Sequence, residues 1–423
     1  MHIAYEVRRC PVRSLPLLII AVALISAALL TPSSQARAQT NSGQVPLTHE
    51  TMWMMKRVGA PVPSPDGKWV VFSLVEPAYD EKDQVSDLWI VPIDATAKPR
   101  RLTFSKGGES GMAWSPDSQR LAFSAKREGD EVNQIYVLNV ADGGEALRVT
   151  SLATGARSPQ WRPDGKALLF TSTVFPGAAN EEANKKIAAE RKALKYKARV
   201  YEKFPIRNWD KWVEDTQVHL FVQDFEPNAK ANDLLAATKL VRERGFAGRV
   251  QDSGEELDSI WTPDGGSIIF VATTNRDMAA YSTTNTALFK VAAAGGEPAQ
   301  LTSGADSYSR PAFRPDGRAL YAMFTVEANG KVYNLDRLAK FSWPNLDKPL
   351  ILTSNWDRSV GGFAITPDSK SIYLTAEEAG NEKLFTMPAD GGEVTLAMEV
   401  MRGVYTGMKI PARAASTVII ANW

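Results

Sequence analysis

Charged and aromatic side chains are concentrated in one short stretch near the middle of the chain. The residues that could bind a ligand there are Glu202, Arg207, Trp209, Asp210, Trp212 and Glu214. An ammonium group needs carboxylates, which Glu202, Asp210 and Glu214 could supply. Arg207 could bind a carbonyl or carboxylate group, and the tryptophans could form the apolar wall of a pocket. The stretch therefore predicts a binding site.

A structural explanation of the same residues stays open. Arg207 and Asp210 could pair with each other, while Trp209 and Trp212 pack the segment onto its neighbours. The sequence does not decide between a ligand site and a packing motif.

The sequence offers no catalytic or cofactor-binding constellation. No serine is flanked by glycine at both second neighbours, as a nucleophile elbow requires. Beyond the first 38 residues the only histidines are His49 and His219, and neither has a candidate nucleophile in its sequence context. A Gly-x-Gly-x-x-Gly motif, a P-loop and paired histidines with metal-ligand spacing are all missing. We therefore predict no catalytic residue, no cofactor and no metal.

The elements that position the stretch follow from a turn motif that recurs six times. Its copies are Ser64-Pro65-Asp66-Gly67, Ser115-Pro116-Asp117-Ser118, Arg162-Pro163-Asp164-Gly165, Thr262-Pro263-Asp264-Gly265, Arg314-Pro315-Asp316-Gly317 and Thr366-Pro367-Asp368-Ser369. Proline presets the first corner of a turn and aspartate bonds back to nearby amides, so each copy predicts a tight hairpin. Successive prolines are 51, 47, 100, 52 and 52 residues apart. A period near 50 indicates a β-propeller, whereas a β-sandwich would need no such self-similarity.

Apolar residues on both sides of each turn indicate the strands of one blade. Tryptophans precede three of the turns, at Trp114, Trp161 and Trp261, and apolar residues follow with period two. A third strand is predicted at the pairs Leu88-Trp89, Ile135-Tyr136, Leu220-Phe221, Leu288-Phe289, Val332-Tyr333 and Leu384-Phe385. A fourth strand often ends in Leu-Thr or Val-Thr. The predicted fold is an all-β propeller of about seven four-stranded blades, the last of them incomplete.

The doubled interval between Pro163 and Pro263 contains only one third-strand signal. We interpret it as a helical insertion in the third blade, from about residue 175 to 218. Its first part, from Asn180 to Phe204, is rich in Ala, Glu, Lys and Arg and should be helical. The insertion could be a lid or docking arm, or only a solvated surface excursion.

The first 38 residues have the pattern of a secretory signal peptide. Arginines precede an apolar run from Leu15 to Leu30, and Ala36-Arg37-Ala38 matches a cleavage site. An uncleaved membrane anchor is the alternative and would be the only membrane contact. Removal of this leader takes away Cys10, the single cysteine, and leaves 45 basic and 47 acidic side chains. We therefore predict a periplasmic or secreted propeller over 39–423 without disulfides, and a near-neutral charge that argues against nucleic acid as a partner.

Three features together carry a resemblance: the turn motifs, the insertion, and the run Arg207-x-Trp209-Asp210-x-Trp212 followed by His219-Leu220-Phe221-Val222. They resemble the N-terminal propeller of the prolyl oligopeptidase family of serine peptidases. The match is to the bacterial dipeptidyl-peptidase and acylaminoacyl-peptidase branch. It spans about Thr48 to Trp423, and TolB-like propellers share the blade repeats. The resemblance implies that the chemistry belongs to a C-terminal α/β-hydrolase domain, which this sequence lacks.

The last repeat is predicted to stop inside a blade, at about 400–423. We therefore expect the substrate-gating propeller portion of a peptidase that acts on short peptides, inactive by itself and partnered by the missing hydrolase domain. The alternative is a stand-alone TolB-like periplasmic propeller that binds a protein partner.

Overall fold

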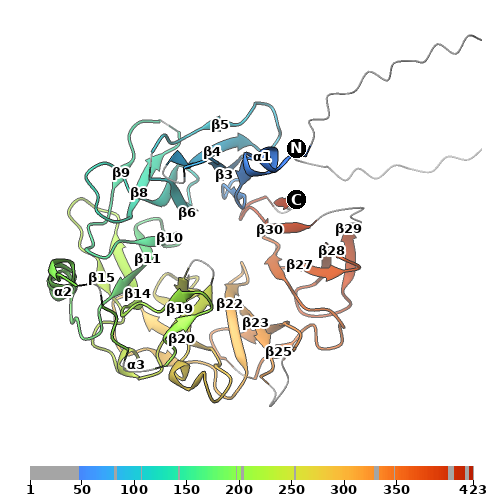
Figure 1. Cartoon of the computed structure of the whole chain (residues 1–423). Coiled ribbons are helices and arrows are strands. Elements are labelled where there is room, and N and C mark those ends of the chain that lie inside the picture. The colour runs from blue at the N-terminus through green and yellow to red at the C-terminus, as the bar shows by residue number, and fades with distance from the viewer. Residues whose placement is uncertain are drawn as a thin grey trace, which may run out of the picture.

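The computed structural model describes residues 47–80, 83–105, 107–141, 143–196, 198–201, 204–251, 254–327, 333–346, 348–398, 404–414 and 419–422. Six antiparallel sheets of four or five strands surround a common axis (Figure 1). The chain is thus an all-β propeller with six complete blades and few helices. The predicted fold class is confirmed at this level.

Each blade runs from the centre of the ring outward in chain order. Blade 1 contains β1 (Arg57–Val58), β2 (Val62–Pro63), β3 (Trp69–Glu76), β4 (Val85–Pro92) and β5 (Arg100–Arg101), and blade 2 contains β6 (Glu109–Trp114), β7 (Arg120–Ala125), β8 (Gln134–Asn139) and β9 (Leu147–Arg148). Blade 3 contains β10 (Arg157–Trp161), β11 (Ala167–Val174), β14 (Gln217–Asp224) and β15 (Asn232–Asp233), and blade 4 contains β18 (Ile260–Trp261), β19 (Ser267–Ala272), β20 (Ala287–Ala292) and β21 (Ala299–Gln300). Blade 5 contains β22 (Ser307–Phe313), β23 (Ala319–Thr325), β24 (Arg337–Ser342) and β25 (Leu350–Ile351), and blade 6 contains β26 (Gly362–Ile365), β27 (Ser371–Glu378), β28 (Asn381–Pro388) and β29 (Thr395–Met398).

The recurring Pro-Asp turns join the first and second strands of every blade. In blade 4 the carboxylate of Asp264 accepts hydrogen bonds from the Thr262 hydroxyl at 2.5 Å and from the Gly266 amide at 3.0 Å. Gly265 has a φ of 68°, which favours glycine at that position. Ser118 takes the same left-handed conformation in blade 2, and its hydroxyl accepts a hydrogen bond from the amide of Asp66 at 3.0 Å. Two of the turns, in blades 1 and 2, are therefore joined to each other.

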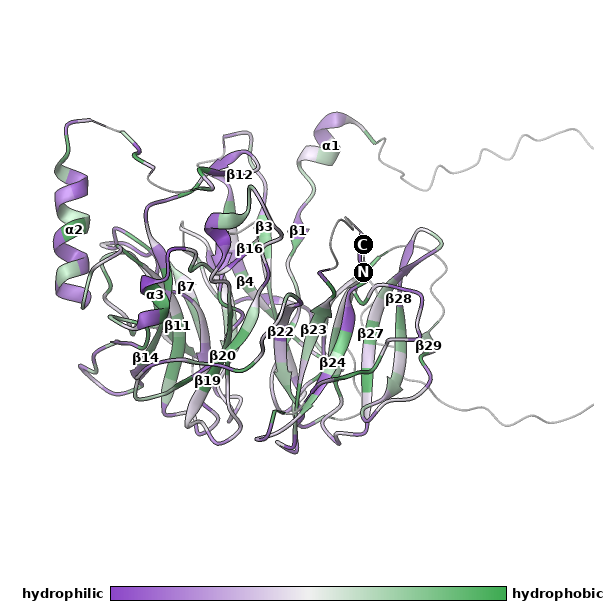
Figure 2. Cartoon of the chain, turned by 90° about the horizontal axis from the view of Figure 1, so that it is seen from below, coloured by the Kyte–Doolittle hydropathy of each residue, from purple (hydrophilic) through white to green (hydrophobic). Residues whose placement is uncertain are grey.

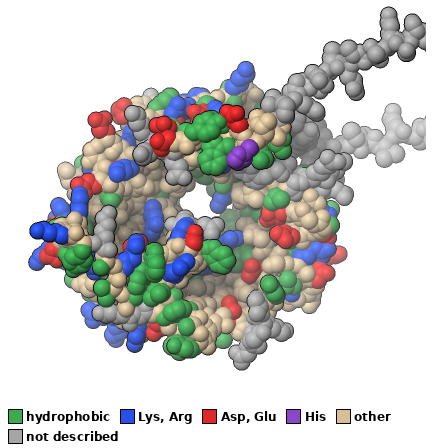
Figure 3. All heavy atoms as spheres, viewed as in Figure 1, with side chains coloured by type: hydrophobic (Ala, Val, Ile, Leu, Met, Phe, Trp, Pro, Cys, Tyr) green, Lys and Arg blue, Asp and Glu red, His purple; other side chains and the backbone are tan. Residues whose placement is uncertain are grey.

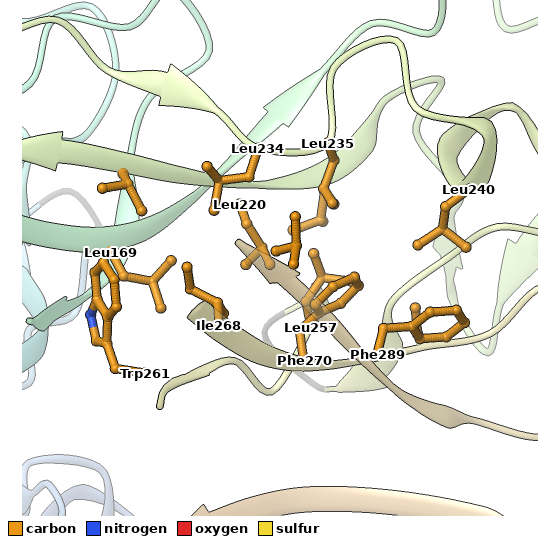
Figure 4. Close-up of a cluster of buried hydrophobic side chains, with 14 of the residues drawn as sticks. Leu169, Leu220, Leu234, Leu235, Leu240, Leu257, Trp261, Ile268, Phe270 and Phe289 are labelled. Carbon is orange, nitrogen blue, oxygen red and sulfur yellow. The ribbon is translucent and has the colours of Figure 1, made fainter. Parts of the chain in front are cut away.

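The tryptophans that precede the turns join neighbouring blades. The indole N–H groups of Trp114, Trp161 and Trp261 donate to the carbonyls of Val62, Ala113 and Gln160, each on the innermost strand of the preceding blade. Apolar side chains fill the space between sheets, and Figure 4 shows the cluster between blades 3 and 4. Blades are therefore held to their neighbours both by burial of apolar surface and by hydrogen bonds.

The Leu-Thr and Val-Thr pairs end the fourth strands for a specific reason. The hydroxyls of Thr103, Thr150, Thr302 and Thr353 accept hydrogen bonds from amides of the third strand at 2.8–3.1 Å. These threonines are buried. The hydroxyl continues the sheet where the backbone of the short fourth strand turns away.

The third strand of blade 5 differs from the sequence prediction. Val332 lies outside the described residues, and the side chain of Tyr333 is almost fully exposed. The strand is β24, in which Leu338 and Phe341 are buried. The Val-Tyr pair resembled the pattern of the other blades, but the strand that buries apolar side chains begins a few residues later.

A two-stranded sheet lies between blades 6 and 1 and consists of β30 (Tyr405–Lys409) and β31 (Ile419–Asn422). Val404 forms a bridge with Glu382 of blade 6, and the amide of Arg413 donates to the carbonyl of Pro65 in blade 1 at 2.8 Å. This sheet therefore contacts both blades. Among the described residues, no strand from the C-terminal part of the chain joins the sheet of blade 1.

The helices and two small hairpins lie outside the sheets. They are α1 (His49–Trp53), α2 (Glu181–Ala193), α3 (Lys239–Arg242), the 3-10 helix η2 (Arg276–Met278), the hairpin β12 (Arg207–Asn208) with β13 (Lys211–Trp212), and the hairpin β16 (Arg249–Gln251) with β17 (Gly254–Glu256). Figure 2 shows α1, β12 and β16 toward one end of the ring. The Pro-Asp turns join first to second strands and the insertion joins a second to a third strand, so the turns and the insertion lie at opposite ends of the antiparallel blades. No helix within the described ranges has the length and apolar character needed to span a membrane.

Candidate functional site

Helix α2 is fixed to the propeller by polar contacts at its N-terminal end. The side chain of Asn180 accepts a hydrogen bond from the amide of Ala183 at 2.9 Å, as expected of an N-cap. Asn184 is buried, and its side chain accepts from the amide of Phe175 at 3.0 Å and donates to the hydroxyl of Thr154 at 3.1 Å. Ala183 and Ile187 pack against the apolar cluster between blades 2 and 3. The helix is therefore attached to the ring.

The helix is shorter than the sequence predicted. It ends at Ala193, where we expected it to continue to Phe204. Arg191, Lys195 and Arg199 would stand four residues apart along such a continuation, and like charges at this spacing destabilise a helix. The charge pattern beyond Ala193 therefore favours an irregular connection.

The aromatic stretch folds into a small hairpin, β12–β13, that projects from the same end of the ring (Figure 2). The ring of Tyr201 stacks on that of Trp212 with centroids 6.1 Å apart, and the Tyr201 hydroxyl donates to the carbonyl of Val213 at 3.1 Å. Trp209 lies at the turn with a φ of 51° and 93% of its surface exposed. An indole held away from the protein in this way is a large apolar surface without a partner among the described residues.

The structure brings some of the predicted site residues together and separates others. The guanidinium of Arg207 lies 5.4 Å from the ring of Trp212 and donates to the carbonyl of Trp209 at 3.0 Å. Glu214 instead pairs with Arg199 at 2.9 Å, and Asp210 is exposed at the hairpin turn. Glu202 lies outside the described residues. Arg207 thus lies beside the ring of Trp212 and holds the backbone of Trp209. The role of the carboxylates stays a prediction.

The two histidines beyond residue 38 have different surroundings. His219 is buried on β14, and its Nδ1 lies 2.8 Å from a carboxylate oxygen of Asp233, whose other oxygen accepts from the amides of Leu235 and Ala236. His49 begins α1 and is exposed. His219 is therefore held within blade 3 by a carboxylate that is itself fixed by two backbone amides.

A polar cavity of about 830 Å³ opens between blades 4, 5 and 6 and was not predicted from the sequence. Its walls come mainly from the ends of the innermost strands and from the loops between second and third strands, the same end of the ring as the insertion. Figure 3 shows this end hollowed at its centre, with charged side chains around the opening. The charged residues that line the cavity are Arg249, Arg310, Arg358, Glu327, Asp336, Asp357, Glu377 and Glu382.

Most of the charged groups in the cavity have partners from the protein. The Nε and one terminal nitrogen of Arg249 each donate a hydrogen bond to the carboxylate of Asp258, both at 2.8 Å. Arg358 pairs with Asp357 and with Glu378, which Lys383 also contacts at 2.7 Å. These two cations hold the pKa of Glu378 below its usual value, Lys383 through the larger effect. The cavity wall is therefore an ordered network of ion pairs.

Arg310 differs from the other two arginines in its backbone and in its contacts. It has a φ of 47° at a β-bulge in β22, and its amide donates to Asp258 at 3.0 Å. Its guanidinium donates to the carbonyl of Gly361 in blade 6 at 2.7 Å. The described residues provide no carboxylate partner for it at ion-pair distance.

The position of Arg310 could have been found from the repeat. Residues five before the turn prolines have positive φ in four blades, and they are Gly111, Ser158, Asp258 and Arg310, with φ of 63°, 54°, 39° and 47°. Bulges in β6, β10 and β22 produce this conformation on the innermost strands. Any residue other than glycine costs backbone free energy in this conformation. A large charged side chain that is held there despite this cost points to a function for that side chain.

Comparison with known proteins places this architecture in a class. The family PD40, described as a TolB beta propeller domain, matches residues 49–193. The propeller domain of the Trilobed protease from Pyrococcus furiosus superposes with a TM-score of 0.54 at 15% identity, over 84% of this chain and 87% of that one. The acylaminoacyl peptidase from Pyrococcus horikoshii gives a TM-score of 0.56 at 17% identity, over 85% of this chain and 48% of that one. The chain therefore has the β-propeller fold that these peptidase domains share.

Sequence comparison adds a more particular relationship. Dipeptidyl-peptidase 5 from Porphyromonas endodontalis is 26% identical over 303 residues, which cover 71% of this chain and 41% of that protein. This chain is thus similar in sequence to dipeptidyl-peptidase 5 and similar in fold to the propeller of an acylaminoacyl peptidase. The aligned part is about two-fifths of the length of the curated relative.

Proposed function

We propose that this propeller binds short peptides at the end that carries the insertion and the polar cavity, and that it restricts and positions substrates for a peptidase. The observation that carries the proposal is the similarity to dipeptidyl-peptidase 5 over 71% of the chain. An exposed aromatic hairpin and a charged cavity lie at one end of the ring, and apolar surface with a few convergent polar groups is what peptide binding requires.

In this proposal the insertion between β11 and β14 is a docking arm. Contacts of α2 with blades 2 and 3 hold its base, and the hairpin presents Trp209, Trp212 and Arg207 to a ligand. Glu202, Asp210 and Glu214 remain the candidate carboxylates for a peptide ammonium group. The hydrolysis itself would need a partner α/β-hydrolase domain, and we expect no peptide hydrolysis by this chain.

The proposal also includes the export of the chain and the number of its blades. We infer a periplasmic or secreted location from the leader pattern of residues 1–38, with cleavage after Ala38. We interpret β30 and β31 as the first two strands of a seventh blade, because they contact blades 1 and 6.

Titration of the full chain with tetra-alanine tests the proposed function. Isothermal titration calorimetry measures the binding. We expect saturable binding that the Trp212→Ala substitution weakens. A chain that binds no tetra-alanine would contradict the proposal and favour the alternative, a TolB-like propeller that binds a protein partner.

Peptidase activity is tested with dipeptide and acyl-amino-acid reporter substrates. We expect no turnover by the purified chain. Turnover that a serine-directed inhibitor abolishes would show that this chain is itself a catalyst, in contradiction to the proposal.

A further inference from the structure

We propose that Arg310 binds the carboxylate group of a ligand in the cavity between blades 4, 5 and 6. The inference deepens the proposed function and rests on it, because it identifies the ligand group as the C-terminal carboxylate of a short peptide.

The hydrogen-bond partners of the three arginines in the cavity single out Arg310. Arg249 is neutralised by Asp258 and Arg358 by Asp357 and Glu378. A guanidinium has five N–H donors, and the contact of Arg310 with the Gly361 carbonyl uses one nitrogen. The side chain is exposed to the cavity, so its remaining donors can form the two parallel hydrogen bonds that a carboxylate accepts.

The backbone around Arg310 is fixed before a ligand arrives. Its amide is bonded to the carboxylate of Asp258, which Arg249 holds with two hydrogen bonds. The bulge and the positive φ aim the residue away from the regular strand direction. A side chain positioned in this way loses less conformational entropy on binding.

A second cation contributes to the field at this site. Lys409, at the end of β30, has its pKa lowered by the surrounding protein and by the positive charge of Arg310. Its side chain still reaches solvent. An anionic group between the two cations would relieve their repulsion.

The acidic residues of the same cavity restrict the kind of anion. Glu327 accepts a hydrogen bond from the Ser307 hydroxyl at 2.9 Å and Asp336 accepts one from Thr325 at 2.5 Å. Glu377 and Glu382 face each other across β27 and β28. This negative charge disfavours a polyanion such as phosphate, whereas a peptide zwitterion presents one carboxylate and no net charge. The cavity volume of about 830 Å³ lies within the range of small-ligand sites.

A matched pair of peptides tests the proposal on the unmodified chain. Tetra-alanine with a free C-terminus and tetra-alanine amide differ only in the carboxylate, and both are titrated calorimetrically at low and high salt. We expect the free acid to bind about tenfold to a hundredfold more tightly, the size of one charge-assisted hydrogen-bonded pair. We also expect this preference to decrease at high salt.

Two substitutions then assign the effect to a residue. Arg310→Gln should remove the preference for the free acid, while Arg318→Gln, an exposed arginine in the Pro-Asp turn of the same blade, should leave it unchanged. Equal binding of both peptides to the unmodified chain would overturn the carboxylate site but leave the proposed function intact. Loss of the preference in both variants would also overturn it, and absence of all peptide binding would overturn both proposals.

Discussion

The two ends of the propeller differ in how their polar groups are hydrogen-bonded. At one end, the six Pro-Asp turns repeat the same local hydrogen bonds with small variations. At the other end, the loops differ in length and carry the insertion, the aromatic hairpin and the charged cavity. The polar groups of the repeated turns are hydrogen-bonded within each turn, whereas the varied loops leave some polar groups available to a ligand.

Carboxylate pKa values show the contrast between the ends. In the turn of blade 4, the Thr262 hydroxyl and the Gly266 amide lower the pKa of Asp264. Near the other end, at the start of β6, burial raises the pKa of Glu109 to about 7, and the charge of Asp87 adds to this while Arg127 opposes it. The folded protein favours the charged form of Asp264, whereas it disfavours the charged form of Glu109, so ionisation of Glu109 lowers the stability of the fold.

The largest effect on the pH dependence of stability is expected from the substitution Glu109→Gln. The raised pKa means that the folded state binds more protons than the unfolded state between about pH 4.5 and 7. Stability should therefore fall as the pH rises through this interval and level off above it. The substitution removes this loss, so we expect a gain of about 1–3 kcal/mol at pH 8 and little gain at pH 5. Urea unfolding at the two pH values measures the difference.

A matched control for Glu109 is Glu145→Gln, because the side chain of Glu145 is almost fully exposed. It should change stability little at either pH. An equal effect of Glu109→Gln at pH 5 and pH 8 would contradict the assignment of the pH dependence to the buried carboxyl.

A smaller effect of opposite sign is expected from Asp264→Ala at the turn end. The variant loses the hydrogen bonds from Thr262 and Gly266, and the exposed position limits the cost to about 1 kcal/mol at pH 7. Because the pKa of Asp264 is lowered, its contribution is present above the unfolded pKa and disappears as the pH falls below about 4. Urea unfolding at pH 7 and pH 3 tests this expectation.

The comparison variant Asp210→Ala, at the exposed hairpin turn, should leave stability unchanged, and an equal loss in both variants would contradict the contrast between the ends.

The same contrast explains what the sequence could predict. The turns and most strands were predicted correctly because each rests on residues within one blade, such as Pro263 and Asp264. The third strand of blade 5 was placed too early because Val332-Tyr333 matches the local pattern, whereas burial selects Leu338 and Phe341.

The cavity could not be predicted from the sequence, because its walls come from blades that are distant along the chain. Arg249 and Glu382 line the same space although more than two repeats separate them. Arg310 did carry a local signal, because it stands five residues before Pro315, at the repeat position that Asp258 occupies in blade 4.

The smallest effect on stability is expected from Trp209→Ala in the hairpin. Trp209 is 93% exposed, so its removal should change the free energy of unfolding by no more than about 0.5 kcal/mol. Binding of tetra-alanine should nevertheless weaken, because an exposed indole contributes apolar contact only once a ligand covers it. Trp161→Ala, which removes a buried indole between blades 2 and 3, should instead cost about 3–5 kcal/mol. Chemical denaturation and peptide titration of both variants separate packing from recognition, and a large loss of stability in Trp209→Ala would assign the hairpin to packing.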